Sequence, residues 1–145
     1  LYLGMATETS TGMTVDSPTT GTVVRRGGFA LAVSLVVNAA LVFASDLAGV
    51  ARGLDPLSYG PVVLFTSLGV IGATVVYAAL ARFTATADRT FTILAVVLAV
   101  VSIVPDVTVV PALPGATTLG AVVLGVMHLT TAAACIAFLT DRVPR

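Results

Sequence analysis

The chain has 145 residues, of which 57% are hydrophobic and only 10% are charged, and its mean hydropathy is +1.08. Because about a quarter of the residues in an ordinary soluble domain are charged, this composition predicts a membrane protein. The arginines and acidic residues balance to a net charge of zero, so no basic field indicates nucleic acid as a partner. With one cysteine and one histidine, the chain is expected to form no intrachain disulfide and to hold no metal or cofactor.

The N-terminal residues 1–24 are rich in Thr, Ser and Gly and have no apolar periodicity. Such a segment has too little apolar surface to bury in a core. We expect a disordered cytoplasmic tail over residues 1–24, followed by a membrane domain over residues 25–145.

The first apolar run follows Arg25 and Arg26, and it predicts a helix over residues 27–51. An arginine pair before an apolar run also occurs in export signals. This run is longer than the ~7 to 15 apolar residues of a signal, and three more apolar runs follow it. We therefore interpret it as a membrane span.

The next two helices are delimited by prolines. Asp55 as N-cap and Pro56 at the first helical position predict a helix over residues 56–82. After a short polar connector, an aliphatic run predicts a helix over residues 88–104, ending before Pro105 because proline disrupts a helix interior. The segment after it, with three prolines and a glycine, is expected to be an ordered outer loop.

The last predicted helix covers residues 117–140. Residues 119–139 carry no formal charge and are long enough to cross a hydrocarbon core of ~30 Å. The sequence therefore predicts an all-α fold, a four-helix transmembrane bundle in the cell membrane.

The arginines predict the orientation of this bundle. With the N-terminus in the cytoplasm, the outer side holds only Arg52, and the inner side holds all the others: Arg25, Arg26, Arg82, Arg89, Arg142 and Arg145. This asymmetry satisfies the positive-inside rule with both termini inside.

Asn38 and His128 are the polar side chains expected at mid-membrane depth, in helices that run in opposite directions. An amide and an imidazole are costly in hydrocarbon and need partners, so we expect the two to lie close together, directly or through Ser34 or a threonine such as Thr131. The sequence places no carboxylate at the depth of His128. This group is either a site for a proton or ligand, or a set of hydrogen bonds that holds the helices together.

Three acidic residues are expected at the outer end of the bundle, namely Asp46, Asp55 and Asp106. Such a rim could attract cations, but solvated loop charges, with a salt bridge from Asp46 to Arg52, are the commoner explanation. No catalytic residue is predicted at this rim or inside the spans.

Four short motifs occur in an order that resembles a domain-of-unknown-function family of small four-helix membrane proteins from prokaryotes. They are Asn38-Ala39, Pro56-Leu57, Pro105 and Met127-His128-Leu129. The resemblance covers about residues 25–142 and implies a four-helix membrane fold without an established activity.

The sequence favours a non-enzymatic membrane protein, a structural or accessory subunit whose small-residue helix faces pack against a second copy or a larger membrane complex. The alternative is a small transporter or channel with a polar site at Asn38 and His128. In size the chain resembles small multidrug exporters, but no glutamate lies in any predicted span. Its single histidine provides one axial haem ligand per chain, which makes a haem protein the least supported class.

Overall fold

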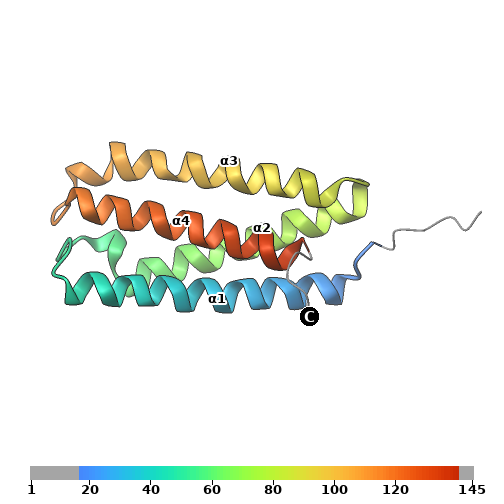
Figure 1. Ribbon diagram of the computed structural model, residues 1–145, viewed down its shortest axis with the longest axis horizontal. Coiled ribbons are helices and arrows are strands. Elements are labelled where there is room, and N and C mark those ends of the chain that lie inside the picture. The colour runs from blue at the N-terminus through green and yellow to red at the C-terminus, as the bar shows by residue number, and fades with distance from the viewer. Residues whose placement is uncertain (1–16, 141–145) are drawn as a thin grey trace, which may run out of the picture.

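The computed structural model describes residues 17–140, and these form four long helices and two short 3₁₀ turns without a strand. The helices are α1 (Thr20–Leu47), α2 (Tyr59–Phe83), α3 (Ala87–Thr108) and α4 (Thr118–Leu139). They run alternately up and down, so the described ends of the chain lie at the same end of the bundle (Figure 1). The all-helical, four-helix fold predicted from the sequence is confirmed.

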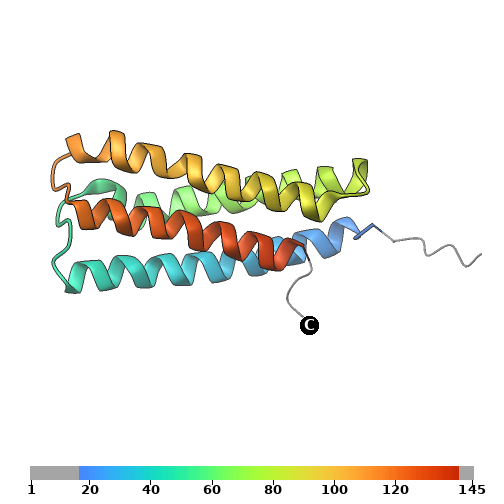
Figure 2. The same ribbon diagram turned by 45° about the horizontal axis from the view of Figure 1, so that its top comes forward.

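Helix α4 lies between α1 and α3 in both views (Figures 1 and 2) and packs against each of them. Helix α1 also packs extensively against α2, whereas α2 and α3 touch each other less. All four helices are long and apolar enough to cross a membrane. Large apolar side chains cover their outer surfaces, which is the pattern expected of helices that face lipid.

Helix α1 begins seven residues before its predicted start. The side chain of Thr19 accepts a hydrogen bond from the backbone N–H of Thr22 and so caps the helix, and Val23 is buried in the core. The prediction of a disordered tail is therefore wrong for residues 20–24, while its residues 1–16 lie outside the described part. The helix ends at Leu47, because the following turn takes left-handed backbone angles at Gly49, Ala51 and Gly53.

The predicted helix over residues 56–82 is divided in two. Asp55–Leu57 form a separate 3₁₀ turn, η1, and α2 begins only at Tyr59, after an extended Ser58. Pro61 falls in the first turn of α2, where a missing N–H costs no helical hydrogen bond.

Helix α3 continues through Pro105 to Thr108, so the predicted end at residue 104 is wrong. Beyond the proline, hydrogen bonds rebuild the helix: the backbone N–H of Val109 donates to the Pro105 carbonyl, and the Thr108 hydroxyl donates to the Val104 carbonyl. The loop predicted from residue 105 begins only after the helix and contains a second 3₁₀ turn, η2 (Val110–Ala112). This change places Asp106 inside a helix.

Helix α4 spans Thr118–Leu139, compared with the predicted range 117–140. Its N-cap is Thr117, whose side chain accepts a hydrogen bond from the Gly120 N–H at 3.0 Å. Gly120 also permits close packing of the loops, because a Cβ there would lie 2.6 Å from the Cβ of Ala51.

The core has two apolar clusters, one toward each end of the bundle. The cluster near the described chain ends contains Val23, Ala30, Val70, Tyr77, Ala81, Phe91, Cys135 and Leu139. The cluster under the loops at the other end contains Val42, Ala51, Leu54, Leu57, Val62, Val110, Leu124 and Met127. Along α1, the buried polar residues Ser34 and Asn38 fall between Ala30 of the first cluster and Val42 of the second.

Candidate ligand-binding cavity

Asn38 is the centre of a buried polar cluster that joins three helices. Its Nδ2 donates to Oγ1 of Thr66 on α2 at 2.9 Å and to Oγ1 of Thr131 on α4 at 3.1 Å. The hydroxyl of Thr130 donates to Oδ1 of Asn38 at 3.4 Å. These contacts satisfy both ends of the amide in an apolar environment and fix α1 against α2 and α4.

Thr66 and Thr130 were not among the candidate site residues derived from the sequence. Both lie in helices that the sequence predicted, Thr66 in α2 and Thr130 in α4. A threonine predicted at the same membrane depth as a buried asparagine is a candidate hydrogen-bond partner for its amide, and this signal could have identified both residues. Ser34, in contrast, is buried with no hydrogen-bond partner for its hydroxyl oxygen among the described residues. The predicted link from Asn38 through Ser34 is therefore not formed.

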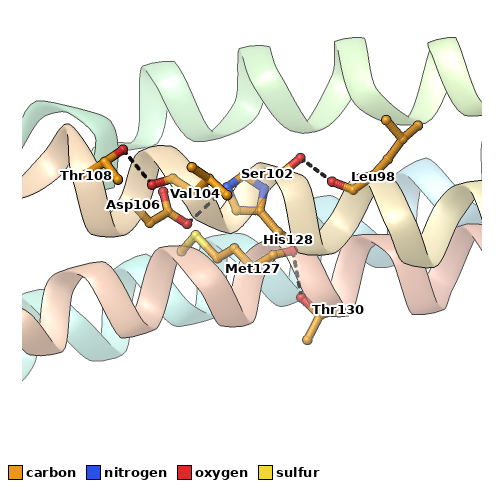
Figure 3. A network of polar contacts seen from close by, with 8 residues as sticks. All are labelled: Leu98, Ser102, Val104, Asp106, Thr108, Met127, His128 and Thr130. Atoms are coloured by element: carbon orange, nitrogen blue, oxygen red, sulfur yellow. Dashed lines mark hydrogen bonds and ion pairs between the residues drawn. The ribbon is translucent and has the colours of Figure 1, made fainter.

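His128 is paired with an acidic residue on α3. Its imidazole points toward the Asp106 carboxylate (Figure 3), with Nε2 at 3.4 Å from Oδ2. The side chain of Asp106 is only 7% exposed, whereas that of His128 is 40% exposed. The expectation that no carboxylate lies at the depth of His128 is wrong, because α3 continues beyond Pro105. A direct contact between His128 and Asn38 is not formed.

The Asp106 carboxylate has an incomplete set of hydrogen bonds. The 3.4 Å contact to His128 is long for a charge-assisted hydrogen bond, and Oδ2 has no hydrogen-bond donor among the described residues. The nearby hydroxyls of Ser102 and Thr108 donate to carbonyls of their own helix instead, to Leu98 and Val104 (Figure 3). Oδ2 of Asp106 is thus a buried acceptor whose nearest described partner, Nε2 of His128, lies beyond good hydrogen-bond distance.

The predicted acidic rim contains only two of its three members. Asp46 and Asp55 are exposed near the loops that follow α1, and both line a small hollow of about 250 Å³. Asp106 is instead buried on the face of α3 that meets α4. Its position in a continuous helix, and not in a loop, accounts for the difference.

A cavity of about 700 Å³ connects the two polar groups, and its size lies within the usual range for small-molecule sites. Most of its lining is apolar, and its polar side chains are Asn38, Thr66, Ser102, Asp106, His128 and Thr131. The cavity opens to the outside of the bundle. Its lining includes Phe65 and Leu68 of α2 and Leu98 of α3, all of which are strongly exposed on the outer surface.

The cavity has the composition of a site for an amphiphilic molecule and not of a metal centre. Within residues 17–140, no three His, Cys, Asp or Glu side chains come together in a way that would hold a metal ion. The ionisable side chains of the lining are Asp106, His128 and Cys135, and no arginine is among them. An apolar cavity with a few convergent polar groups and an ionisable pair is the usual form of a ligand site.

Polar groups toward the opposite end of the bundle have structural roles. Arg26 is buried and donates to the Leu139 carbonyl at 3.1 Å, which caps the C-terminal end of α4. The Tyr77 hydroxyl donates to Asp88 at 2.7 Å, and the Tyr77 ring packs edge-on against Phe91. These contacts tie α1 to α4 and α2 to α3, away from the cavity.

The fold and the cavity define a class of protein: a small bundle of four helices, each able to cross a membrane, that surrounds an open site with an Asp–His pair. The chain belongs to a family of unknown function, DUF6069, which matches residues 18–145. No curated protein and no solved structure matches the chain.

Proposed function

We propose that the protein is a multi-pass protein of the cell membrane that binds a small, largely apolar molecule in the cavity between α2, α3 and α4 and transports it. The observation that carries this proposal is the buried Asp106, paired with His128 on the wall of a cavity of about 700 Å³. Ionisable side chains inside membrane spans are expensive, and they occur mainly where a substrate or ion passes. The proposed role is binding and transport, not catalysis.

The lateral opening of the cavity supports a ligand that arrives from the lipid. Exposed side chains of α2 and α3, among them Phe65, Leu68 and Leu98, form part of the lining. A molecule dissolved in the bilayer would reach the Asn38 cluster and the Asp106–His128 pair without crossing the outer loops. This geometry suits a transporter of lipophilic molecules better than an aqueous channel, whose walls would be more polar.

The proposed orientation has both termini in the cytoplasm. The exposed side chains of Arg25, Arg82 and Arg89 belong to the end of the bundle where the described chain ends lie, and Arg52 belongs to the other end. Their distribution agrees with the positive-inside rule.

Ligand binding can be tested by thermal unfolding of the purified protein with a panel of small lipophilic compounds, because a ligand that binds only the folded state raises the melting temperature. Ala99 is buried and lines the cavity, so Ala99→Phe should fill it and abolish the stabilisation. Ala79 is exposed on α2 outside the cavity, and Ala79→Phe is the matched control. If no compound in the panel raised the melting temperature of the wild-type protein more than that of the Ala99→Phe variant, ligand binding in the cavity would be refuted. Uptake of a stabilising compound into proteoliposomes then tests transport.

A second candidate function is that of a structural or accessory subunit. The observation that favours it is a stripe of small residues on α1, Ala40, Ala44 and Ala48, which are all exposed in the single chain. Small residues let helices approach closely in a membrane, so this stripe suits a second copy or another membrane subunit. Disulfide cross-linking of Ala44→Cys in a Cys135→Ala background tests for a second copy, and co-purification in mild detergent tests for another subunit.

A further inference from the structure

We propose that the ligand is a monovalent organic cation with an apolar body, which pairs with Asp106 and displaces one proton from the Asp106–His128 pair. This inference rests on the proposed function and names the chemical class of its ligand. It starts from the one buried acceptor in the cavity wall that lacks a hydrogen-bond donor, Oδ2 of Asp106.

The burial of the two partners favours a cation over an anion. The side chain of Asp106 is 7% exposed, so solvent does little to stabilise a charge on its carboxylate, whereas the side chain of His128 is 40% exposed. An anion next to His128 would lie beside this carboxylate, and like charges at short range in a medium of low dielectric repel strongly. A cation beside the pair would instead be attracted by the Asp106 carboxylate.

Charge balance in the cavity implies the proton exchange. The other polar side chains that line the cavity carry no charge on any of the four helices: Asn38 from α1, Thr66 from α2, Ser102 from α3, and Thr131 and Cys135 from α4. No arginine of the described residues lines the cavity to compensate a lone carboxylate. An uncompensated charge in a membrane span is costly, so the empty pair retains one proton and is neutral as a whole.

Binding of a monovalent cation replaces that proton and keeps the site neutral. The binding step starts from the protonated pair and the free cation. It ends with the Asp106 carboxylate, neutral His128, the bound cation and one released proton. The carboxylate and the imidazole share the proton in the empty site, and solvent takes it when the cation binds. The same exchange, run at the other side of a membrane, would couple outward movement of the cation to inward movement of a proton.

The lining explains why the cation should carry an apolar body. Besides its few polar groups, the cavity is lined by side chains such as Phe65, Leu98 and Leu124. Burying apolar surface against them is favourable, so the body of the ligand provides affinity while Asp106 selects its charge. Inorganic cations lack this contribution.

The test uses two rigid ions of nearly identical shape and opposite charge, tetraphenylphosphonium and tetraphenylborate, with the full-length protein in detergent. Equilibrium dialysis should show saturable binding of tetraphenylphosphonium to the wild-type protein and none of tetraphenylborate. Asp106→Asn should weaken the binding of the cation by about tenfold or more, because it removes a buried charge partner. Asp55→Asn removes the same charge from an exposed position outside the cavity and should leave the affinity unchanged.

A second measurement does not depend on any variant being folded. In weakly buffered solution, tetraphenylphosphonium binding to the wild-type protein should release close to one proton per bound cation, detected with a pH indicator. Equal binding of tetraphenylborate, unchanged affinity in a folded Asp106→Asn protein, or binding without proton release would overturn the inference. In each of these cases, the proposed function would still be supported if neutral lipophilic compounds stabilised the wild-type protein and Ala99→Phe abolished that stabilisation. Failure of the cation inference can therefore be distinguished from failure of the proposed function.

Discussion

Nε2 of His128 on α4 lies 3.4 Å from Oδ2 of Asp106 on α3, and this contact closes one wall of the cavity. Asp106 is buried within a helix that is long and apolar enough to cross a membrane. Because the pair joins two helices and also lines the cavity, its contributions to stability and to binding need separate measurements.

A double-mutant cycle measures the contribution of the pair to stability. Asp106→Asn, His128→Gln and the double variant should show a coupling free energy of about 0.5–1 kcal/mol, at the low end of the usual range for contacting groups because His128 is partly exposed. Unfolding in mixed micelles measures the change in the free energy of unfolding for each of the three variants relative to the wild-type protein. Strictly additive effects would mean that the contact contributes nothing to folding and that its role is confined to the ligand.

The Asn38 cluster should contribute more to stability than the neighbouring Ser34. Asn38→Ala removes an amide that contacts Thr66, Thr130 and Thr131, and it should lower the free energy of unfolding by about 1–2 kcal/mol. Ser34→Ala is the matched control, since that hydroxyl oxygen is buried without a partner among the described residues, and its removal should be neutral or stabilising. An equal cost for both substitutions would contradict the assigned hydrogen bonds.

The four long apolar helices were predictable because long charge-free runs and the polar residues between them are local properties of the sequence. A buried Asn38 with partners on other helices also followed from the cost of an amide in hydrocarbon. The side chain that completes the cavity, Asp106, was not predictable in this way. A proline is usually read as the end of a helix, and only the hydrogen bonds formed beyond Pro105 show that α3 continues.

The residues that Asn38 and His128 contact were equally hard to derive from the sequence. Asn38 and His128 were expected at one depth, but the sequence does not determine how each helix is rotated about its axis. Thr130 and Thr131 lie two and three residues after His128 on α4, and both contact Asn38 of α1. His128 faces α3 instead, so the two groups are linked by the cavity and not by a bond.

Gly115 should be the most sensitive glycine of the loops at the end of the bundle that lies opposite the described chain ends. Its φ of 75° is strained for other residues, and a Cβ there would lie 2.7 Å from backbone atoms of residues 52–54. Gly53 has a φ of 82° but no atom within 4 Å of such a Cβ. Gly53→Ala should therefore cost about 1 kcal/mol from backbone strain alone, and Gly115→Ala clearly more, as measured by unfolding. Equal costs would show that the two loops separate readily.

The orientation predicts a pattern of cysteine labelling in a Cys135→Ala background. Thr86→Cys lies in the connection between α2 and α3 and should react only after the membrane is permeabilised. Asp55→Cys and Ala112→Cys, in the connections at the opposite end, should react with an impermeant maleimide in intact cells. Labelling of Thr86→Cys in intact cells, with protection of the other two, would reverse the topology.

The first turns of α1 provide the last prediction, which concerns the length of chain that the bundle needs. Val23 is 2% exposed and belongs to the apolar cluster that also holds Tyr77 and Leu139, and Thr19 caps the helix. A chain that begins at Arg25 loses the cap, the first turn and the packing of Val23. Loss of a buried valine and an N-cap together should cost about 2–3 kcal/mol.

The matched control is a chain that begins at Ser17 and retains every described residue of α1. Its melting temperature in detergent should lie well above that of the chain beginning at Arg25. A substitution separates the two contributions: Val23→Ala in the Ser17 chain removes only the packing, whereas Thr19→Ala removes only the cap. If both truncated chains melted at the same temperature, the first turn of α1 would be dispensable, and the bundle would start where the sequence alone predicts it, near residue 27.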